Sequence, residues 1–461
     1  MRVPVMQEVE FSRGRLKKAD FFSLAVGLLI WAMLLLTAGP SMAADEEGGA
    51  EEPGNRATHI TLKEAYQRSV LGHEEVEIAD EGIMLARSSL KKADSEFLPD
   101  IIAEGKYQKY TTTKRVSGFL LQPDNSKSFD LVVSQPLFQG GASWHGRKSA
   151  VLSMKKSREG AKAAGEFIML ETARAFFNLL KAEKEVEIAR SSLKRSTERR
   201  EVAEARFEVG ETTKTDLLRA ESEKAGAEAA LITARSSLKN ARDIFVRFVP
   251  VSGEFSLKDP GIAADTSLNP EELIKSAYKN RLDLTQTSLD RQIADLGVKS
   301  SRSGFLPSLR VEGLYSRRDR DPATSFLLKE SISATVVLTY PLFEGGLRMA
   351  EYNEAKTKAR IEGLRMRALK KDIIVEVRRA YNNVKEKEAV IKSLKRQLSF
   401  ARENYRMVFE QFKSGVATNV DVTDANTELL TADRSYMNAL FDLELAVVEL
   451  KYATGILHNE I

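Results

Sequence analysis

Two hydrophobic patterns alternate along the chain, one typical of long helices and one typical of strands. Between residues 377 and 412 apolar side chains recur every three or four residues, with one gap at Lys387 and Glu388, which is the spacing of a coiled-coil seam. The members of this seam are Val377, Tyr381, Val384, Ile391, Leu394, Leu398, Ala401, Tyr405, Val408 and Phe412. Between residues 331 and 340 the apolar side chains occupy every second position, which predicts a strand with one apolar and one polar face. We assign the seam to packing and not to chemistry.

Proline is missing from the two segments in which long helices are expected. No proline occurs between Pro136 and Pro250, and none occurs after Pro341. Because proline costs about 3 kcal/mol inside a helix, such segments can hold long helices. Gly210 and Gly415 are each followed by a Thr-x-x-Asp pattern, which predicts the end of one helix and the capped start of the next.

The same order of motifs occurs twice, about 205 residues apart. Phe-Leu-Pro begins at Phe97 and again at Phe305, and Pro-Leu-Phe-x-Gly-Gly begins at Pro136 and again at Pro341. This spacing far exceeds the 20 to 50 residues of solenoid repeats, so each copy is expected to form one large half of the molecule.

Each predicted half contains a helix, a β-hairpin, a helix of about seventy residues and a shorter returning helix. In the first half, residues 60–259, the last three are expected over 101–138, 142–209 and 214–249. In the second half, residues 260–461, they are expected over 309–343, 347–414 and 418–456. At 1.5 Å per residue each long helix would measure roughly 100 Å. Four strands are too few to close a barrel, so other copies of the chain would have to complete the sheet.

The N-terminus has the pattern of a secretory signal. Basic residues within 13–18 precede an apolar run over 21–38, and Ser41-Met42-Ala43 offers small residues for cleavage. We therefore predict a signal peptide over 1–43 and an acidic, disordered linker over 44–59. A retained membrane anchor is the alternative, because the apolar run is nearly long enough to span a bilayer. An exported chain with alternating strands can enter a membrane as a barrel, which in a bacterium means the outer membrane.

Composition excludes several kinds of function. The 70 basic and 66 acidic residues nearly balance, so no nucleic-acid-binding surface is expected. Cysteine is absent, and the four histidines are scattered without metal-ligand spacing. Because the chain also lacks a phosphate-binding glycine loop and a serine-hydrolase motif, we predict no enzyme activity, cofactor or metal site.

These motifs together resemble those of the TolC-like outer membrane efflux proteins, also called outer membrane factors. The resemblance extends from about Ile60 to the C-terminus and includes the Gly-x-x-Thr-x-x-Asp-Val turn that begins at Gly415. Arg281-Leu282-Asp283-Leu284 is also similar to the Arg-Pro-Asp-Leu that often opens the second half in this family, with Leu282 in place of the proline.

The resemblance implies a mainly helical fold with a small β part. Three copies would form one twelve-stranded outer-membrane β-barrel, surrounded by lipid, that continues into a long α-helical barrel in the periplasm. Such a homotrimer is the exit duct of a tripartite efflux or type I secretion system. It is a passive conduit whose periplasmic tip opens when a periplasmic adaptor and an inner-membrane pump or ABC transporter dock. The turns at Gly210 and Gly415 are the expected adaptor contacts, and the substrate stays open between drug, metal and protein.

A pore constriction is expected at Asp421 and Asp424, which lie one turn apart on one helix face. The resemblance implies that three copies place these carboxylates around the tunnel axis, where they would favour cations. The alternative for Asp421 is a local one, in which its side chain caps its own helix.

The resemblance also implies a latch between the two helix hairpins. In well-known members a tyrosine and an arginine of the second hairpin bond to a Thr-Asp pair of the first. Thr215 and Asp216 match that pair, but Phe412 and Ala417 occupy the other two positions and cannot make the bond. Asp216→Ala is therefore expected to change leakage through the duct little.

Two possibilities follow from the missing bond. The tip closes through other residues, with Lys214 and Glu211 as candidates, or the resting duct is leakier.

The competing hypothesis for the whole chain is a structural trimeric coiled coil, a periplasmic spacer or adhesin stalk. It shares the long helices and the export signal but gives no reason for paired amphipathic strands in each half.

Overall fold

The computed structural model describes residues 58–116, 119–261, 269–323 and 328–460. The signal peptide predicted over 1–43 and most of the linker predicted over 44–59 lie outside the described residues. Disorder was the wrong prediction for the last two linker residues, because Thr58–Ile60 forms strand β1. This strand pairs in parallel with β6, Phe255–Leu257, from the other end of the first half. The partner lies almost 200 residues away, so local sequence could not indicate the pairing.

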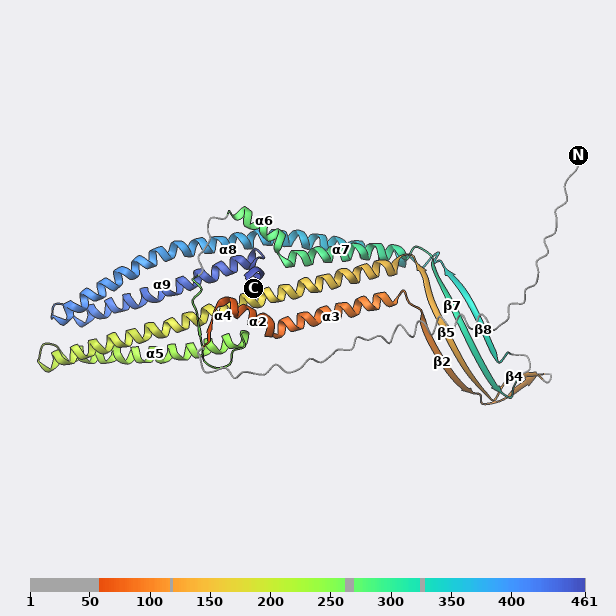
Figure 1. Ribbon diagram of the computed structural model, residues 1–461, viewed down its shortest axis with the longest axis horizontal. Helices are drawn as coiled ribbons and strands as arrows, with labels where there is room; N and C mark the ends of the chain where they lie inside the picture. Colours follow the sequence, from red (N-terminus) through yellow and green to blue (C-terminus); the bar gives the residue numbers. More distant parts are fainter. Residues whose placement is uncertain (1–57, 117–118, 262–268, 324–327, 461) are drawn as a thin grey trace, which may run out of the picture. The chain divides into compact units, whose positions relative to one another are not determined.

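Two sets of four helices with matching lengths dominate the described chain (Figure 1). In the first half, α2 (Leu62–Gly72), α3 (Glu74–Ser95), α4 (Ala142–Glu208) and α5 (Lys214–Phe248) have 11, 22, 67 and 35 residues. In the second half, α6 (Pro270–Asn280), α7 (Leu282–Ser303), α8 (Leu347–Lys413) and α9 (Asn419–Ala453) repeat these four lengths.

Two helices precede each β-hairpin where the sequence analysis expected one. The chain leaves the helical conformation at His73, with a ψ angle of 130°, and at Arg281, with a ψ angle of 125°. The last helix also ends earlier than the predicted 418–456. Gly455 has a φ angle of 69°, which takes the chain out of α9, and the short 3-10 helix η1 (Leu457–Glu460) follows.

The Gly-Gly of each hairpin motif starts a long helix. Gly140 and Gly141 have φ angles of 61° and 89°, and Gly345 and Gly346 have 61° and 88°. This left-handed conformation favours glycine because it has no Cβ. At Gly140 a Cβ would also lie only 2.4 Å from the carbonyl oxygen of Ser303, so the first motif tolerates no side chain there.

Four antiparallel strands form the main sheet, in the order β2-β5-β7-β8. They are β2 (Asp100–Lys109), β5 (Asn125–Gln139), β7 (Ser308–Asp321) and β8 (Glu330–Thr339). The central pair β5 and β7 joins the two halves of the chain. A small hairpin of β3 (Lys114–Val116) and β4 (Phe119–Gln122) lies at the end of the sheet that is remote from the helices (Figure 1).

Strand register gives this sheet two unlike faces. On the apolar face, Ile332, Val336 and Leu338 of β8 are 71%, 67% and 68% exposed. The residues beside them on β7 are also mostly apolar: Tyr315, Val311 and Leu309. We name the opposite face the polar face. On β8 it carries Ser331, Ser333 and Thr335. Among the described helices none is long and apolar enough to cross a membrane.

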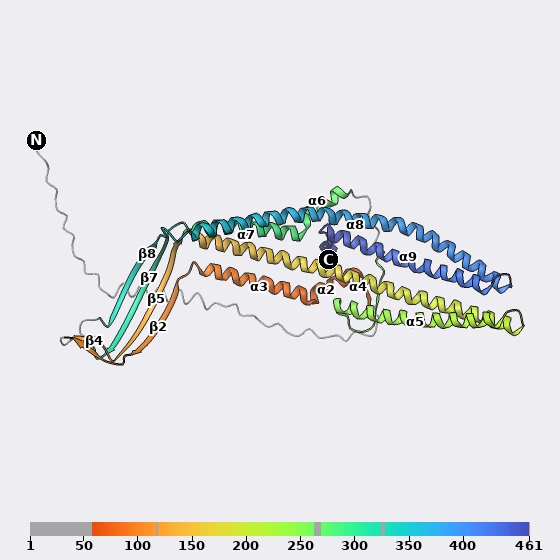
Figure 2. The same cartoon turned by 180° about the vertical axis from the view of Figure 1, so that it is seen from behind.

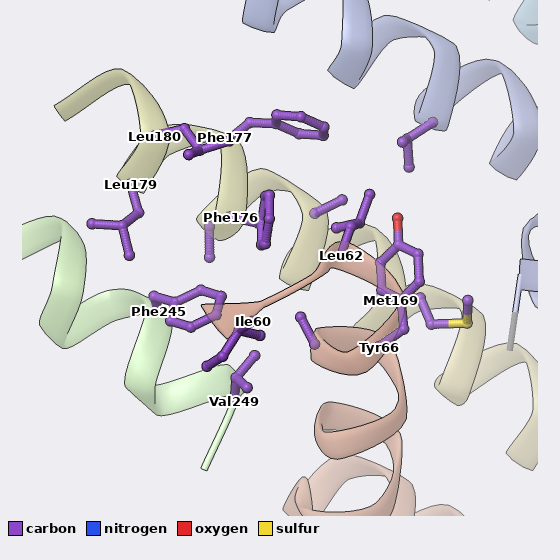
Figure 3. Packing of buried hydrophobic residues seen from close by; sticks show 14 of the residues in the cluster. Ile60, Leu62, Tyr66, Met169, Phe176, Phe177, Leu179, Leu180, Phe245 and Val249 are labelled. Carbon is purple, nitrogen blue, oxygen red and sulfur yellow. The ribbon is translucent and has the colours of Figure 1, made fainter. Parts of the chain in front are cut away.

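The largest apolar cluster forms where β1, α2, α4 and α5 meet (Figure 3). Phe176 of α4 lies at its centre, with its ring edge-on to Phe177 at 5.7 Å and to Phe245 of α5 at 6.1 Å between centroids. Ile60 of β1 and Leu457 of η1 are fully buried in the same cluster. The cluster therefore ties the C-terminal end of the described chain to its first half.

The two helix hairpins extend in the same direction, away from the sheet (Figure 2). The first consists of α4 and α5, and the second consists of α8 and α9. Contacts between α4 and α9 hold them side by side, so the two turns lie at the same end of the helices. This end is the place where the sequence analysis predicted the constriction and the latch.

Candidate functional site: the paired hairpin turns

The two hairpins turn through the same local geometry. Gly210 follows α4 and Gly415 follows α8, with φ angles of 79° and 80°. A glycine in this conformation just after a helix is a common helix terminus, because its amide satisfies a free carbonyl of the last turn. Here the amide of Gly210 donates to the carbonyl of Phe207, and that of Gly415 donates to the carbonyl of Phe412.

A capping box starts each returning helix. The carboxylate of Asp421 accepts from the Thr418 hydroxyl at 2.6 Å and from the Thr418 amide at 2.8 Å. These hydrogen bonds, the hydroxyl's first, lower the pKa of Asp421. The Thr213 hydroxyl likewise lowers the pKa of Asp216. The local role considered for Asp421 is thus present in this chain.

Asp424 lies exposed on α9, one turn beyond the capping box. Glu428 lies exposed one turn further along the same helix face. The side chains of Val422 and Ala425 are buried instead, so this part of α9 has an acidic outer face and an apolar inner face. Glu428 was not among the residues predicted from the sequence, although its spacing of four residues from Asp424 was a usable signal.

Arg206, near the end of α4, joins the two turns. Its Nη1 donates to the carbonyl oxygen of Phe412 at 3.1 Å, and its guanidinium carbon lies 5.5 Å from the centroid of the Phe412 ring. Its Nε also lies 3.5 Å from the carboxylate of Glu211. Phe412 therefore bonds across the hairpins through its carbonyl and its ring, although it has no hydroxyl.

Two further arginines of α4 reach the second hairpin. Arg199 has only 3% of its side chain exposed and lies 2.9 Å from the carboxylate of Glu223 on α5. It also donates to the Thr423 hydroxyl on α9 at 3.3 Å. Arg195 donates to Oδ1 of Asn426 on α9 at 2.9 Å, and burial lowers the pKa of its guanidinium. We name Arg195, Arg199 and Arg206 the arginine ladder.

The predicted latch residues lie near the ladder but bond differently. The side chain of Asp216 accepts hydrogen bonds from Thr212 and Thr213 in its own turn, while its backbone carbonyl accepts from the side-chain amide of Asn419 at 3.2 Å. Lys214 and Thr215 are exposed. Glu211 contacts Arg206, and Ala417 packs beside the apolar cluster of the second hairpin.

The arginine ladder could not be recognised from the sequence because α4 contains many charged residues. A charged residue on a long helix normally faces solvent, so a pattern of arginines carried little information by itself. The spacing of 195, 199 and 206 does place the three side chains on one helix face. Within the described part of the chain, no group of three His, Cys, Asp or Glu residues could hold a metal ion.

Similarity to known proteins extends over most of the chain. The profile of the outer membrane efflux protein family matches residues 66–243 and 273–456. The chain is 26% identical to the outer membrane protein TolC of Vibrio cholerae over 336 residues, which are 71% of this chain and 76% of that protein. It is 24% identical to the alkaline protease secretion protein AprF of Pseudomonas aeruginosa over 341 residues, 71% of this chain and 69% of that protein.

Solved structures show the same fold. The outer membrane channel CmeC of Campylobacter jejuni superposes with a TM-score of 0.73 at 16% identity, covering 91% of this chain and 94% of that one. A crystal structure of CusC superposes with a TM-score of 0.74 at 15% identity, covering 90% and 97%. At these identities the likeness concerns the fold and not the chemistry of single residues.

Proposed function

The chain belongs to the outer membrane efflux protein family and serves as an outer membrane exit duct for efflux or secretion; we propose that it does so as a homotrimer gated at its helical tip. The resemblance that the motifs indicated and the outer membrane location are thereby confirmed. Members of this family are channels and not enzymes, which agrees with the absence of catalytic motifs in the sequence.

The proposal of a trimer rests on the four-stranded sheet. Strands β2 and β8 are its two edges, and each leaves a row of backbone groups without a partner in the same sheet. In a bilayer such groups must be hydrogen-bonded, so an open sheet cannot remain there. Pairing β2 of one copy with β8 of the next removes every edge, and three copies give a barrel of twelve strands.

The two faces of the sheet support the same assembly. With the apolar face outward, Ile332, Val336 and Leu338 would meet lipid, and the polar face would line water. The equal lengths of the four helices in each half support the proposal that the chain is a duplicated unit. In a trimer each copy would then contribute two hairpins of similar length to a tunnel through the periplasm.

The arginine ladder is the proposed latch. It holds the second hairpin, α8 and α9, against α4 through hydrogen bonds to Phe412, Thr423 and Asn426. A periplasmic adaptor that docks at the turns of Gly210 and Gly415 would release this hairpin and widen the tip. Asp421, Asp424 and Glu428 would then lie around the widening opening. The inner-membrane pump or ABC transporter supplies the energy, and this chain supplies the path.

The first test is the mass of the protein extracted from membranes, measured by light scattering with correction for detergent. A mass near three mature chains that stays dispersed only in detergent is the expected result. A species that remains soluble without detergent would contradict the barrel, because the apolar face would not then be in lipid. In that case the structural stalk hypothesis would replace the duct.

A further inference from the structure

The polar face of the sheet carries its charges in separate rows. Strand register places Glu104, Asp130 and Ser316 side by side in one row, together with Ser331 of β8. The Ser316 hydroxyl donates to the carboxylate of Asp130 at 2.5 Å, which confirms that these side chains share a face. We name Glu104, Asp130, Ser316 and Ser331 the acidic row.

The next rows, further from the helices, are basic. Lys106, Ser128 and Arg318 are aligned across β2, β5 and β7, and Gln108, Ser126 and Arg320 follow one step further. Lys106 lies 2.9 Å from Glu104, so the carboxylate of Glu104 partly compensates the charge of Lys106. The two arginines therefore dominate the end of the polar face, and we name Lys106, Arg318 and Arg320 the basic collar.

Strand alternation keeps the nearby carboxylates away from the basic collar. Asp319 and Asp321 alternate with Arg318 and Arg320, and neighbouring residues of a strand point to opposite faces. Asp319 lies 3.7 Å from Arg317, which is also on the opposite face. Among the described residues, the polar face thus offers no carboxylate in the rows of Arg318 and Arg320.

We propose that the basic collar binds multivalent anions, those with phosphate, sulfate or carboxylate groups, at the outer mouth of the duct. This inference rests on the proposed function, because only a closed barrel with its polar face inward brings the three collars together. Three copies would place six guanidinium groups around one opening, and guanidinium forms paired hydrogen bonds with such anions. Ser126 and Ser128 add hydroxyl donors beside them.

The collar has the opposite charge to the helical tip. Asp424 and Glu428 are exposed carboxylates at one end of the proposed duct, and Arg318 and Arg320 are cations at the other. Fixed charges that line a narrow opening raise the local concentration of ions of the opposite sign. The duct would therefore concentrate cations at its periplasmic end and anions at its outer mouth.

The absence of cysteine allows a direct test by single-cysteine labelling. Ser128→Cys places a thiol in the basic collar and Ser331→Cys places one in the acidic row. Each variant, verified as a trimer in membranes, is labelled with a negatively and a positively charged methanethiosulfonate of similar size. After each rate is divided by the rate of the same reagent with a small thiol in solution, we expect the anionic reagent to react at least about fivefold faster than the cationic one at Ser128→Cys, and the preference to reverse at Ser331→Cys.

Three controls test whether the arginines cause this charge preference. Adding Arg318→Gln and Arg320→Gln to the Ser128→Cys variant should bring the rate ratio close to one, while inorganic tripolyphosphate should protect the thiol only when both arginines are present. Salt at about 1 M should also reduce the ratio, because the screening length falls to about 3 Å.

The labelling results test the basic collar and the proposed duct separately. If both thiols react but neither prefers a charge, the collar is overturned and the duct stands. If neither thiol reacts with aqueous reagents in membranes, although both react after unfolding, the polar face does not line water and both proposals fall. Val336→Cys, on the apolar face, should stay unreactive in membranes and serves as the lipid-facing control.

Discussion

The two long helices, α4 and α8, have the same length but very different surroundings. Twenty residues of α4 are buried, against seven of α8. The reason is the number of neighbours: α4 is covered by α2, α3, α5, α7 and α9, whereas α8 packs against α6, α7 and α9. Equal helices from a repeated pattern therefore acquire unequal roles, one as the centre of the chain and one at its edge.

The edge position of α8 leaves apolar side chains uncovered. Val375, Phe400 and Met407 are 65%, 73% and 51% exposed, and they lie along one side of the helix. In the proposed trimer, another copy would pack against this side. The first half is thus largely completed within the chain, whereas in the proposed trimer a neighbouring copy would complete the second half.

The helix junctions of the two halves differ as well. Between α2 and α3, His73 stacks on Phe248 with 5.5 Å between ring centroids and 13° between planes. Between α6 and α7, Arg281 lies 2.7 Å from Asp283 and from Glu376 of α8, and it donates to the Ala453 carbonyl of α9. The first junction is held by ring stacking and by a helix cap, in which the Glu75 amide donates to Nδ1 of His73 at 3.2 Å, and the second by charge.

The largest expected difference in the free energy of unfolding is between substitutions at matching positions of the two long helices. Phe176 of α4 and Tyr381 of α8 occupy the same place in the repeated Arg-Ala-aromatic motif. Phe176→Ala should lower the free energy of unfolding by about 4 kcal/mol, since it leaves a cavity in the largest cluster. Tyr381→Ala should cost less than about 2 kcal/mol, because this side chain is only partly buried.

Urea denaturation of the protein in detergent measures both losses. Equal losses would break the comparison, because they would mean that contacts between copies bury Tyr381 as deeply as the chain buries Phe176. The same substitutions in a monomeric variant would then distinguish burial within the chain from burial between chains.

The junctions should differ by a smaller amount. Arg281→Ala removes bonds to two carboxylates and a carbonyl and should lower the free energy of unfolding by about 2 kcal/mol. His73→Ala removes the ring stack and also the helix cap in which the Glu75 amide donates to Nδ1 of His73, and it should cost about 1 to 2 kcal/mol. Arg281→Lys should recover only part of the loss, since lysine cannot bind Asp283 through two nitrogens. A full recovery would show that charge alone holds the junction.

The arginine ladder predicts a change in conductance. Replacing Arg199 and Arg206 together by alanine should raise single-channel conductance and dye leakage, because it frees the second hairpin from α4. Arg200→Ala is the matched control, since Arg200 pairs with Glu204 on its own helix at 2.8 Å. Asp216→Ala should also change leakage little. Leakage that rises with Asp216→Ala and not with the arginine variants would assign the latch to Asp216.

The smallest and most equal effects are expected at the two capping boxes. Thr213→Ala and Thr418→Ala should each lower helix stability by about 1 kcal/mol, since both remove the same hydrogen bond. Hydrogen exchange at the first turns of α5 and α9 measures this loss. A clearly larger effect at one turn would show that the two hairpins are not locally equivalent.

Acid should weaken both caps in the same direction. The pKa of Asp216 and that of Asp421 are lower in the folded chain than the ordinary value of 3.8. Their contribution to stability is therefore complete above that value and is lost as the pH falls through the lower, folded pKa. Protection factors from hydrogen exchange at the two turns, which divide out the pH dependence of the intrinsic exchange rate, should fall below about pH 4, and Asp216→Asn and Asp421→Asn should remove this dependence.

Local sequence patterns were sufficient for much of the fold. The long helix expected over 142–209 corresponds to Ala142–Glu208, and the one expected over 347–414 corresponds to Leu347–Lys413. Proline exclusion, glycine turns and side-chain alternation act within a few residues, so the sequence displays them directly. The capping role of Asp421 was visible for the same reason.

The sequence by itself determined the element types, the duplicated order of motifs and the resemblance to a family, because all of these depend on neighbouring residues. Only the tertiary structure decided that β1 pairs with β6, that α4 is enclosed while α8 is not, and that Arg199 and Arg206 reach the second hairpin. These features join segments about 200 residues apart. An arginine in a charged helix has the same local pattern whether it faces water or a partner helix, and only the position of that partner separates the two.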